Sequence, residues 1–271
     1  MSPLWRDEVG IFLGPGKFVL ARMRRGIRPR CVAEQGVVIE TNHADDWQPV
    51  LEALAEHLDN ELWQDARARV VISDHWTRYA VLPWSRDISG EAERIAHARL
   101  ILSNTYGDLV DKWTIRLSDS PPGSAAVVSA ISSELLQALG EILRPRRLQL
   151  VSLQPQLILS YNNWRDELPE TAAWFASVDE GSLAAMHISN GQCDRVRAVR
   201  ISDDWAVELR RIQTMGRLAQ SRADEGQVFV DAPSWLRAVA DTNDASVNWL
   251  NDGRKPENVA ENVVALKGMY T

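Results

Sequence analysis

The sequence contains little cysteine, with Cys31 and Cys193 the only two in 271 residues. Two cysteines cannot build the disulfide framework of a small secreted domain, and neither has a metal-ligand neighbour. We therefore expect both thiols to behave as small buried hydrophobic groups in a reducing compartment.

Long hydrophobic runs are also missing. No uninterrupted apolar stretch approaches the roughly 18 residues of a membrane span, and residues 1–8 lack the apolar core of a signal peptide. We expect a cytoplasmic protein with no direct membrane insertion. On this interpretation, any position at the inner membrane depends on a partner.

An excess of positive charge is absent as well. The 30 Lys and Arg residues are outnumbered by 37 Asp and Glu residues, which gives a net charge of -7 and a pI near 5.3. This balance argues against nucleic acid or an anionic bilayer as a general partner. One basic segment departs from this balance, and its arginines are Arg22, Arg24, Arg25, Arg28 and Arg30. We interpret the segment as a solvated turn, and the alternative is contact with phosphate or with an acidic partner.

Dedicated metal and hydrolase motifs are not found. The five histidines form no HExxH motif, no short His-x-His spacing and no pair with cysteine, and no serine lies in a nucleophile elbow. We expect no metal site and no catalytic residue.

The chain does have an ordinary globular composition, with 45% hydrophobic and 25% charged residues. Its length suggests about two domains. Strands and helices alternate, and the same order of three strands, a helix and a strand occurs in both halves. The predicted strands of the two halves are 8–14, 16–23, 31–40, 69–73, 79–82, 113–117, 125–130 and 148–153, then 172–179, 182–189, 195–201 and 228–230.

Helices are predicted from apolar spacing. Leu51, Leu54, Leu58 and Leu62 form one stripe behind the capping candidates Asn42 and Asp45. Further helices are expected over 88–105, over 135–143 before Pro145, after Pro155, and over 205–219 behind Asp203 and Asp204. The strands 69–73 and 79–82 are predicted to pair as a hairpin that turns at 74–76.

Two glycine-containing hairpins open the two halves. The first covers 9–20 and the second covers 176–186, and aligning Gly14 with Gly181 sets Phe12 opposite Asp179. This duplication favours an α/β, bilobed actin-like (RNase H-like) ATPase fold. The polar stretch 166–170 divides an N-terminal lobe with an inserted subdomain, 1–168, from a C-terminal lobe, 169–271.

The hairpin turns form the candidate nucleotide site. Glycine lets backbone N–H groups approach phosphates, and an acid from each lobe positions a metal and water. Phe12 in place of an acid and Pro15, which has no N–H, indicate a degenerate site that needs no cofactor. Residual ATP and Mg binding stays open through Gly14, Gly16, Lys17, Asp179, Gly181 and Ser182.

Three segments resemble one protein family. The stretch 69–84 followed by Tyr106-Gly107, the opening 10–14 and the later 178–181 are similar to segments of the pilus-biogenesis proteins PilM and MshI and of the cytoplasmic part of GspL. The usual first motif in that family is Gly-Ile-Asp-Ile-Gly, from which Phe12 departs. The residues 231–233 stand where the family usually has a glycine-rich adenosine turn.

The resemblance implies a function. It implies a non-catalytic cytoplasmic platform of a type IV pilus or type II secretion-like machine, which recruits the tail of a PilN-like inner-membrane protein and possibly a hexameric assembly ATPase. Among eleven tryptophans, Trp76 and Trp84 are the candidate partner-binding residues. The alternatives are an ATP-dependent phosphotransferase or ATPase of the actin/sugar-kinase superfamily and a self-polymerising cytoskeletal protein.

Overall fold

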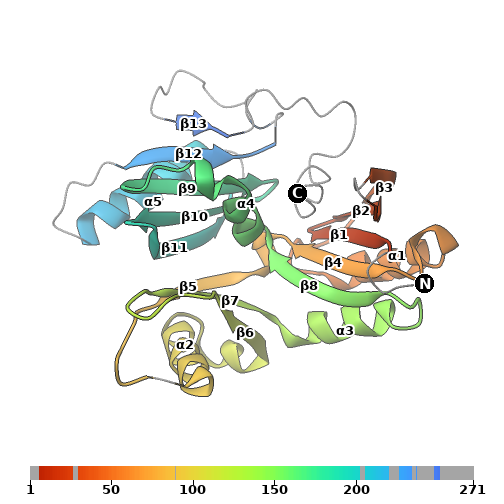
Figure 1. Ribbon diagram of the computed structural model, residues 1–271, viewed down its shortest axis with the longest axis horizontal. Coiled ribbons are helices and arrows are strands. Elements are labelled where there is room, and N and C mark those ends of the chain that lie inside the picture. Colours follow the sequence, from red (N-terminus) through yellow and green to blue (C-terminus); the bar gives the residue numbers. More distant parts are fainter. Residues whose placement is uncertain are drawn as a thin grey trace. The chain divides into compact units, whose positions relative to one another are not determined.

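The computed structural model describes residues 6–26, 30–88, 90–201, 205–219, 226–233, 236 and 247–250. Figure 1 labels its helices and strands. Contacts divide the described chain into two compact units. The first unit contains 6–76 and 133–159, and the second contains 77–132 and the described residues from 160 to 250.

The first unit is built on a five-stranded sheet with the order β3-β2-β1-β4-β8. β1 pairs with β2, and β2 with β3, in antiparallel fashion, whereas β1–β4 and β4–β8 are parallel pairs. All seven residues of β1 are buried because this strand is central. The strands are β1 (Glu8–Gly14), β2 (Lys17–Arg24), β3 (Arg30–Val38), β4 (Arg67–Ile72) and β8 (Gln149–Pro155).

Two helices of the first unit contact each other, α1 (Gln48–Leu58) and α3 (Ser133–Leu143). α1 buries Leu51, Leu54 and Leu58, as its apolar spacing predicts. The prediction for Leu62 is wrong, because the α-helix ends at Leu58 and Leu62 is exposed in the 3₁₀ helix Glu61–Trp63.

The predicted caps of α1 are also wrong. Trp47 is the N-cap residue, and Asn42 and Asp45 lie too far before the first turn of the helix. Asp46 is the acid that accepts a hydrogen bond there, from Gln48 N at 3.2 Å. Pro49, within the first turn, tolerates its missing N–H because that group has no helical partner.

The second unit repeats the same topology. Its five-stranded sheet has the order β11-β10-β9-β12-β13, with two antiparallel pairs followed by two parallel pairs. This match confirms the predicted fold of two related lobes, each opening with a hairpin. The strands are β9 (Ala172–Asp179), β10 (Ser182–Ser189), β11 (Gln192–Arg200), β12 (Gln227–Asp231) and β13 (Val247–Trp249).

One face of this second sheet packs on α5 (Trp205–Ala219). Trp205, Leu209 and Ile212 of the helix join Trp174 and Val178 of β9 in one buried cluster. Trp205 also meets Trp249 edge to face, with ring centroids 5.4 Å apart. The predicted capping residues Asp203 and Asp204 and the side chain of Ala219 lie outside the described residues.

A smaller sheet completes the second unit, with the order β5-β7-β6 and one covering helix. Its core joins Leu82 and Val128 of the strands to Ala98 and Leu102 of the helix. The elements are β5 (Arg78–Leu82), α2 (Glu91–Tyr106), the 3₁₀ helix Gly107–Lys112, β6 (Trp113–Leu117) and β7 (Ala126–Ser132). The sequence assigns 77–132 to the N-terminal lobe, whereas the contacts group it with the chain after 160.

The predicted hairpin of residues 69–73 with 79–82 is wrong. β4 pairs with β1 and β8, and β5 pairs with β7 in another sheet. β4 lies between two parallel neighbours and buries four of its six residues, and the chain then turns through the 3₁₀ helix Asp74–Trp76. The Asp74 carboxylate anchors that turn by accepting a hydrogen bond from Leu157 N at 3.0 Å.

α4 (Gln156–Trp164) follows Pro155 directly, as predicted, and continues into the 3₁₀ helix Arg165–Glu167. The cysteines are only partly buried, which corrects the expectation of full burial. Desolvation raises the pKa of the Cys193 thiol to about 12, so this thiol stays protonated at neutral pH and is a poor nucleophile.

Candidate functional site

The turn of the first hairpin holds Gly14, Gly16 and Lys17. Gly14 and Lys17 close the β1–β2 ladder, and Pro15 and Gly16 form the turn between them. Gly16 has a φ of +61°, and a Cβ there would lie 2.9 Å from the carbonyl oxygen of Ile39. The Gly16 carbonyl in turn accepts a hydrogen bond from Ile39 N at 2.7 Å. Glycine is therefore required at 16 by the hairpin itself, with or without a ligand.

Phe12 fills the sheet face beside this turn. Its ring is fully buried against Val19, Ala21, Val71 and Leu159. A Cβ at Gly14 would lie 3.0 Å from the ring, so Gly14 makes room for it. Lys17 Nζ lies 5.9 Å from the ring centroid, within cation–π range. An apolar ring and an ammonium group thus occupy this end of the hairpin.

The turn of the second hairpin brings Asp179 and Ser182 together. These two residues are paired in register across β9 and β10, and both are buried. Glu180 and Gly181 form the turn between them, and Gly181 has a φ of +74°. A Cβ at Gly181 would meet no atom within 4 Å, so the left-handed backbone alone accounts for glycine at this position.

Matching the two turns corrects the sequence alignment. Each hairpin has a two-residue turn with a positive-φ glycine at its second position, which makes Gly16 equivalent to Gly181. Gly14 then corresponds to Asp179, and Phe12 corresponds to Ser177. The predicted pairing of Phe12 with Asp179 is therefore wrong by two residues. At the position of Asp179, the first hairpin has no side chain at all.

A polar cluster that the sequence did not reveal lies in the second unit. Ser177 is paired in register with Asp231, the last residue of β12, and Ser160 of α4 donates a hydrogen bond to the Asp231 carboxylate. Beside it, Tyr161 packs edge to face on Phe175, and burial raises the pKa of the Tyr161 hydroxyl. The available signal was an acid directly after the apolar run 228–230. The sequence interpretation instead places that acid, with residues 232 and 233, at the position of an adenosine turn.

The two candidate tryptophans have different environments. Trp76 is only 8% exposed, and its indole N–H donates a hydrogen bond to the Ala44 carbonyl at 2.9 Å. Its ring is therefore part of the packing of the first unit. Trp84 is 45% exposed in the loop after β5, and the Arg86 guanidinium lies 5.9 Å from its ring centroid.

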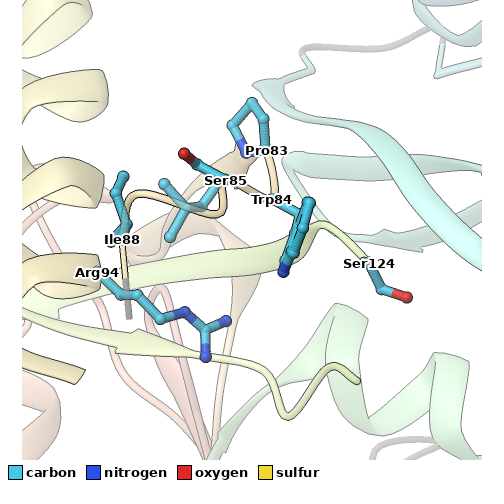
Figure 2. Close-up of a pocket in the computed structure, with 7 residues that line it drawn as sticks. Pro83, Trp84, Ser85, Ile88, Arg94 and Ser124 are labelled. Carbon is cyan, nitrogen blue, oxygen red and sulfur yellow. The ribbon is translucent and has the colours of Figure 1, made fainter. Parts of the chain in front are cut away.

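Trp84 forms one wall of a pocket in the second unit. Figure 2 shows its indole and the Arg94 guanidinium extending to the same side of the loop that carries Pro83. Arg94 is held by a 3.2 Å hydrogen bond to Ser120. An exposed aromatic ring beside an oriented guanidinium suits a peptide with apolar and polar groups. The lining residues are Leu82, Pro83, Trp84, Ser85, Ile88, Arg94 and Ser124.

The described residues show neither a metal-binding cluster nor a membrane-spanning helix. No group of three or more His, Cys, Asp or Glu side chains in this part of the chain is placed to hold a metal ion. Among the same described residues, no helix is both long enough and apolar enough to cross a bilayer.

The comparisons with known proteins give structural matches only. No protein-family model matches the sequence, and no curated protein matches it. A Bacteroides thetaiotaomicron protein of unknown function with an actin-like ATPase fold has a TM-score of 0.66 at 10% identity. The match covers 99% of this chain and 98% of that one.

Two further similar structures come from assembly machines. The PilM–PilN type IV pilus biogenesis complex matches with a TM-score of 0.60 at 15% identity, over 96% of this chain and 98% of that one. The cytoplasmic domain of EpsL, an inner-membrane component of the type II secretion system of Vibrio cholerae, matches with a TM-score of 0.58 at 10% identity, over 97% and 94%. Together with the duplicated sheets, these matches show that the chain has the actin-like ATPase fold.

Proposed function

We propose that this chain is a non-catalytic platform protein of a type IV pilus or type II secretion-like machine. It works in the cytoplasm and reaches the inner membrane through a partner. The observation that carries the proposal is the match, over nearly the full length of each chain, to a protein of the PilM–PilN complex and to the cytoplasmic domain of EpsL. The support is the shared architecture, and a binding measurement tests the proposed role.

The proposed platform works without nucleotide. In the first hairpin Phe12 fills the sheet face, Pro15 lacks an N–H, and Gly14 supplies no carboxylate where the second hairpin has Asp179. A phosphate chain and its metal would lose a donor and an oxygen ligand there. Asp179 and Ser182 remain as the polar pair of the second hairpin. We propose that these two side chains are too few to support phosphoryl transfer.

Thermal unfolding of the full chain tests this absence of nucleotide binding. A ligand present at about 100 times its Kd adds about 2.7 kcal/mol of stability, which is several degrees for a chain of this size. We expect Mg-ATP at about 5 mM to move the midpoint by less than about 1 °C. Mg with inorganic triphosphate is the control for general anion effects. A larger rise with ATP that disappears in Asp179→Ala would favour the ATPase or phosphotransferase alternative.

The proposed partner is the short cytoplasmic tail of a PilN-like inner-membrane protein, and a hexameric assembly ATPase is a second proposed partner. Trp84 is the proposed contact, because its ring is exposed beside the pocket whereas Trp76 is buried. The probe is a synthetic peptide of the cytoplasmic tail of a PilN-like inner-membrane protein from the same organism. Saturable binding of that tail to the purified full chain is the expected result.

Replacing Trp84 gives the sharper prediction. Trp84→Ala is expected to weaken tail binding at least tenfold, because buried tryptophan anchors contribute about 2 kcal/mol or more to interfaces. Leu109→Ala, which truncates another exposed apolar side chain of the second unit, is the matched control and should leave the affinity unchanged. Calorimetric titration measures both. An equal effect of the two substitutions would remove Trp84 from the proposed surface.

A further inference from the structure

Three of the arginines singled out in the sequence, Arg24, Arg25 and Arg30, lie with two more arginines at one end of the first sheet. This arginine cluster surrounds Glu8, the first residue of β1, whose side chain is fully buried. Arg25 and Arg69 bind the Glu8 carboxylate directly, the latter at 2.9 Å, and Arg67 lies 3.6 Å from it. Arg24 and Arg30 form the last pair of the β2–β3 ladder, at the same end of the sheet. The cluster is Arg24, Arg25, Arg30, Arg67 and Arg69.

The cluster has more positive charge than its own acid can balance. Three guanidinium groups, those of Arg25, Arg67 and Arg69, share one carboxylate, that of Glu8. The nearby Asp7 adds nothing to the balance, because it is paired with Arg22 at 3.0 Å. Arg22 also donates to the Leu62 and Gln64 carbonyls, so it is committed to the interior of this unit. Two positive charges therefore remain around Glu8, and Arg24 and Arg30 add two more at this end of a chain whose net charge is -7.

The pair Arg24 and Arg30 is the second observation that points to a ligand. The two residues lie directly opposite each other in the β2–β3 ladder, and both are exposed. Like charges in that arrangement destabilise a sheet. Neither has an ion pair with any residue in the described ranges, from which 27–29 are missing. A bound anion would convert this repulsion into two attractive contacts.

We propose that the arginine cluster binds carboxylate side chains of an acidic segment in a protein partner. The guanidinium fork matches a carboxylate through two parallel N–H donors, and every basic residue of the cluster is arginine. Glu8 is an internal example, since Arg25 and Arg69 already hold its carboxylate. This surface is separate from the Trp84 pocket, and its role does not depend on the proposed membrane partner.

An anionic membrane fits the same surface less well. The side chains of Arg25, Arg67 and Arg69 are 26–35% exposed, so they are reached by an inserted side chain more readily than by a flat layer of headgroups. The acidic remainder of the chain would also be repelled by an anionic bilayer. A protruding acidic segment can reach the partly exposed arginines and avoids the repulsion that a whole anionic bilayer would cause.

Fluorescence anisotropy of labelled hexaglutamate with the full chain tests the proposal. We expect saturable binding at about 50 mM NaCl that weakens strongly at about 300 mM, because charge pairing is screened by salt. The double variant Arg24→Glu/Arg30→Glu should lower the affinity at least about tenfold. The matched control is Arg116→Glu/Arg210→Glu, which changes the net charge equally at exposed sites of the second unit and should lower it less than about threefold.

Three results would overturn the proposal. The first is no binding of hexaglutamate by the wild type, and the second is an equal loss in both double variants. The third is that the wild type co-sediments with vesicles of about 30% phosphatidylglycerol but does not bind hexaglutamate, and that only Arg24→Glu/Arg30→Glu abolishes the co-sedimentation. This result would assign the cluster to a membrane surface. Circular dichroism checks the fold, and Arg24→Gln/Arg30→Gln replaces the double variant if that protein unfolds.

Discussion

Phe12→Asp is expected to lower the free energy of unfolding by more than about 4 kcal/mol, because a carboxylate would replace a ring in an apolar cluster. The ring is fully buried against Val19, Val71 and Leu159. The substitution places a carboxylate in the first hairpin, so it tests directly whether that hairpin can accommodate an acid. Urea denaturation measures the loss.

The control is Phe12→Leu, which keeps an apolar side chain and is expected to cost less than about 2 kcal/mol. We also expect Phe12→Asp to gain no stabilisation from Mg-ATP, since Gly14 and Pro15 would still provide neither a carboxylate nor an extra N–H. A folded Phe12→Asp protein that Mg-ATP stabilises would mean that one substitution separates this chain from a nucleotide-binding relative. That outcome would contradict our account, in which the first hairpin packs around the Phe12 ring and does not bind nucleotide.

The second large effect is expected at Glu8. Removing the buried partner of an ion-pair network costs about 3–5 kcal/mol, and the partial exposure of Arg25, Arg67 and Arg69 reduces this toward about 3 kcal/mol for Glu8→Ala. The three guanidinium groups would then repel one another around an empty position. Urea denaturation at low and high salt measures the change, and salt should recover part of the loss.

Asp108→Ala is the matched control for Glu8→Ala, because it removes an exposed acid in the second unit. It should change the unfolding free energy by less than about 0.5 kcal/mol. If Glu8→Ala had an equally small effect, the arginine cluster would be held by the backbone alone. The reading of Glu8 as its organising anion would then be wrong.

The fold was predictable because the same order of strands and helices occurs in both halves of the sequence. Strand–turn–strand patterns with a glycine in the turn occur near 14 and near 181, and each precedes a third strand, a helix and a buried strand. Few other folds repeat this order of elements in two halves of one chain, so the repeat favoured the actin-like class. The same sheet order in both units confirms it.

Strand partners and register were not predictable to the same degree. The apolar patterns of β4 and β5 identify each as a strand, but they do not say that β4 pairs with β1 and β8 while β5 pairs with β7. Aligning Gly14 with Gly181 ignored which glycine adopts a positive φ. The structure shows that Gly16 is the one equivalent to Gly181.

The residues of the candidate site also divide into those that the local sequence predicted and those that it did not. Gly16 and Gly181 were identified correctly as turn residues from local sequence, since backbone conformation is a local property. The arginine cluster was seen only in part, because Arg67 and Arg69 reach Glu8 from a strand about sixty residues away. The burial of Trp76 depends on the Ala44 carbonyl, which no local pattern indicates.

Binding of the membrane-partner tail, measured by calorimetry with and without Mg-ATP, tests the central claim most directly. If the chain is the nucleotide-independent platform that we propose, it should bind the tail with the same Kd in both conditions, within about twofold. Tail binding that requires Mg-ATP, or whose Kd changes tenfold or more with it, would contradict this account and would indicate a nucleotide-dependent switch.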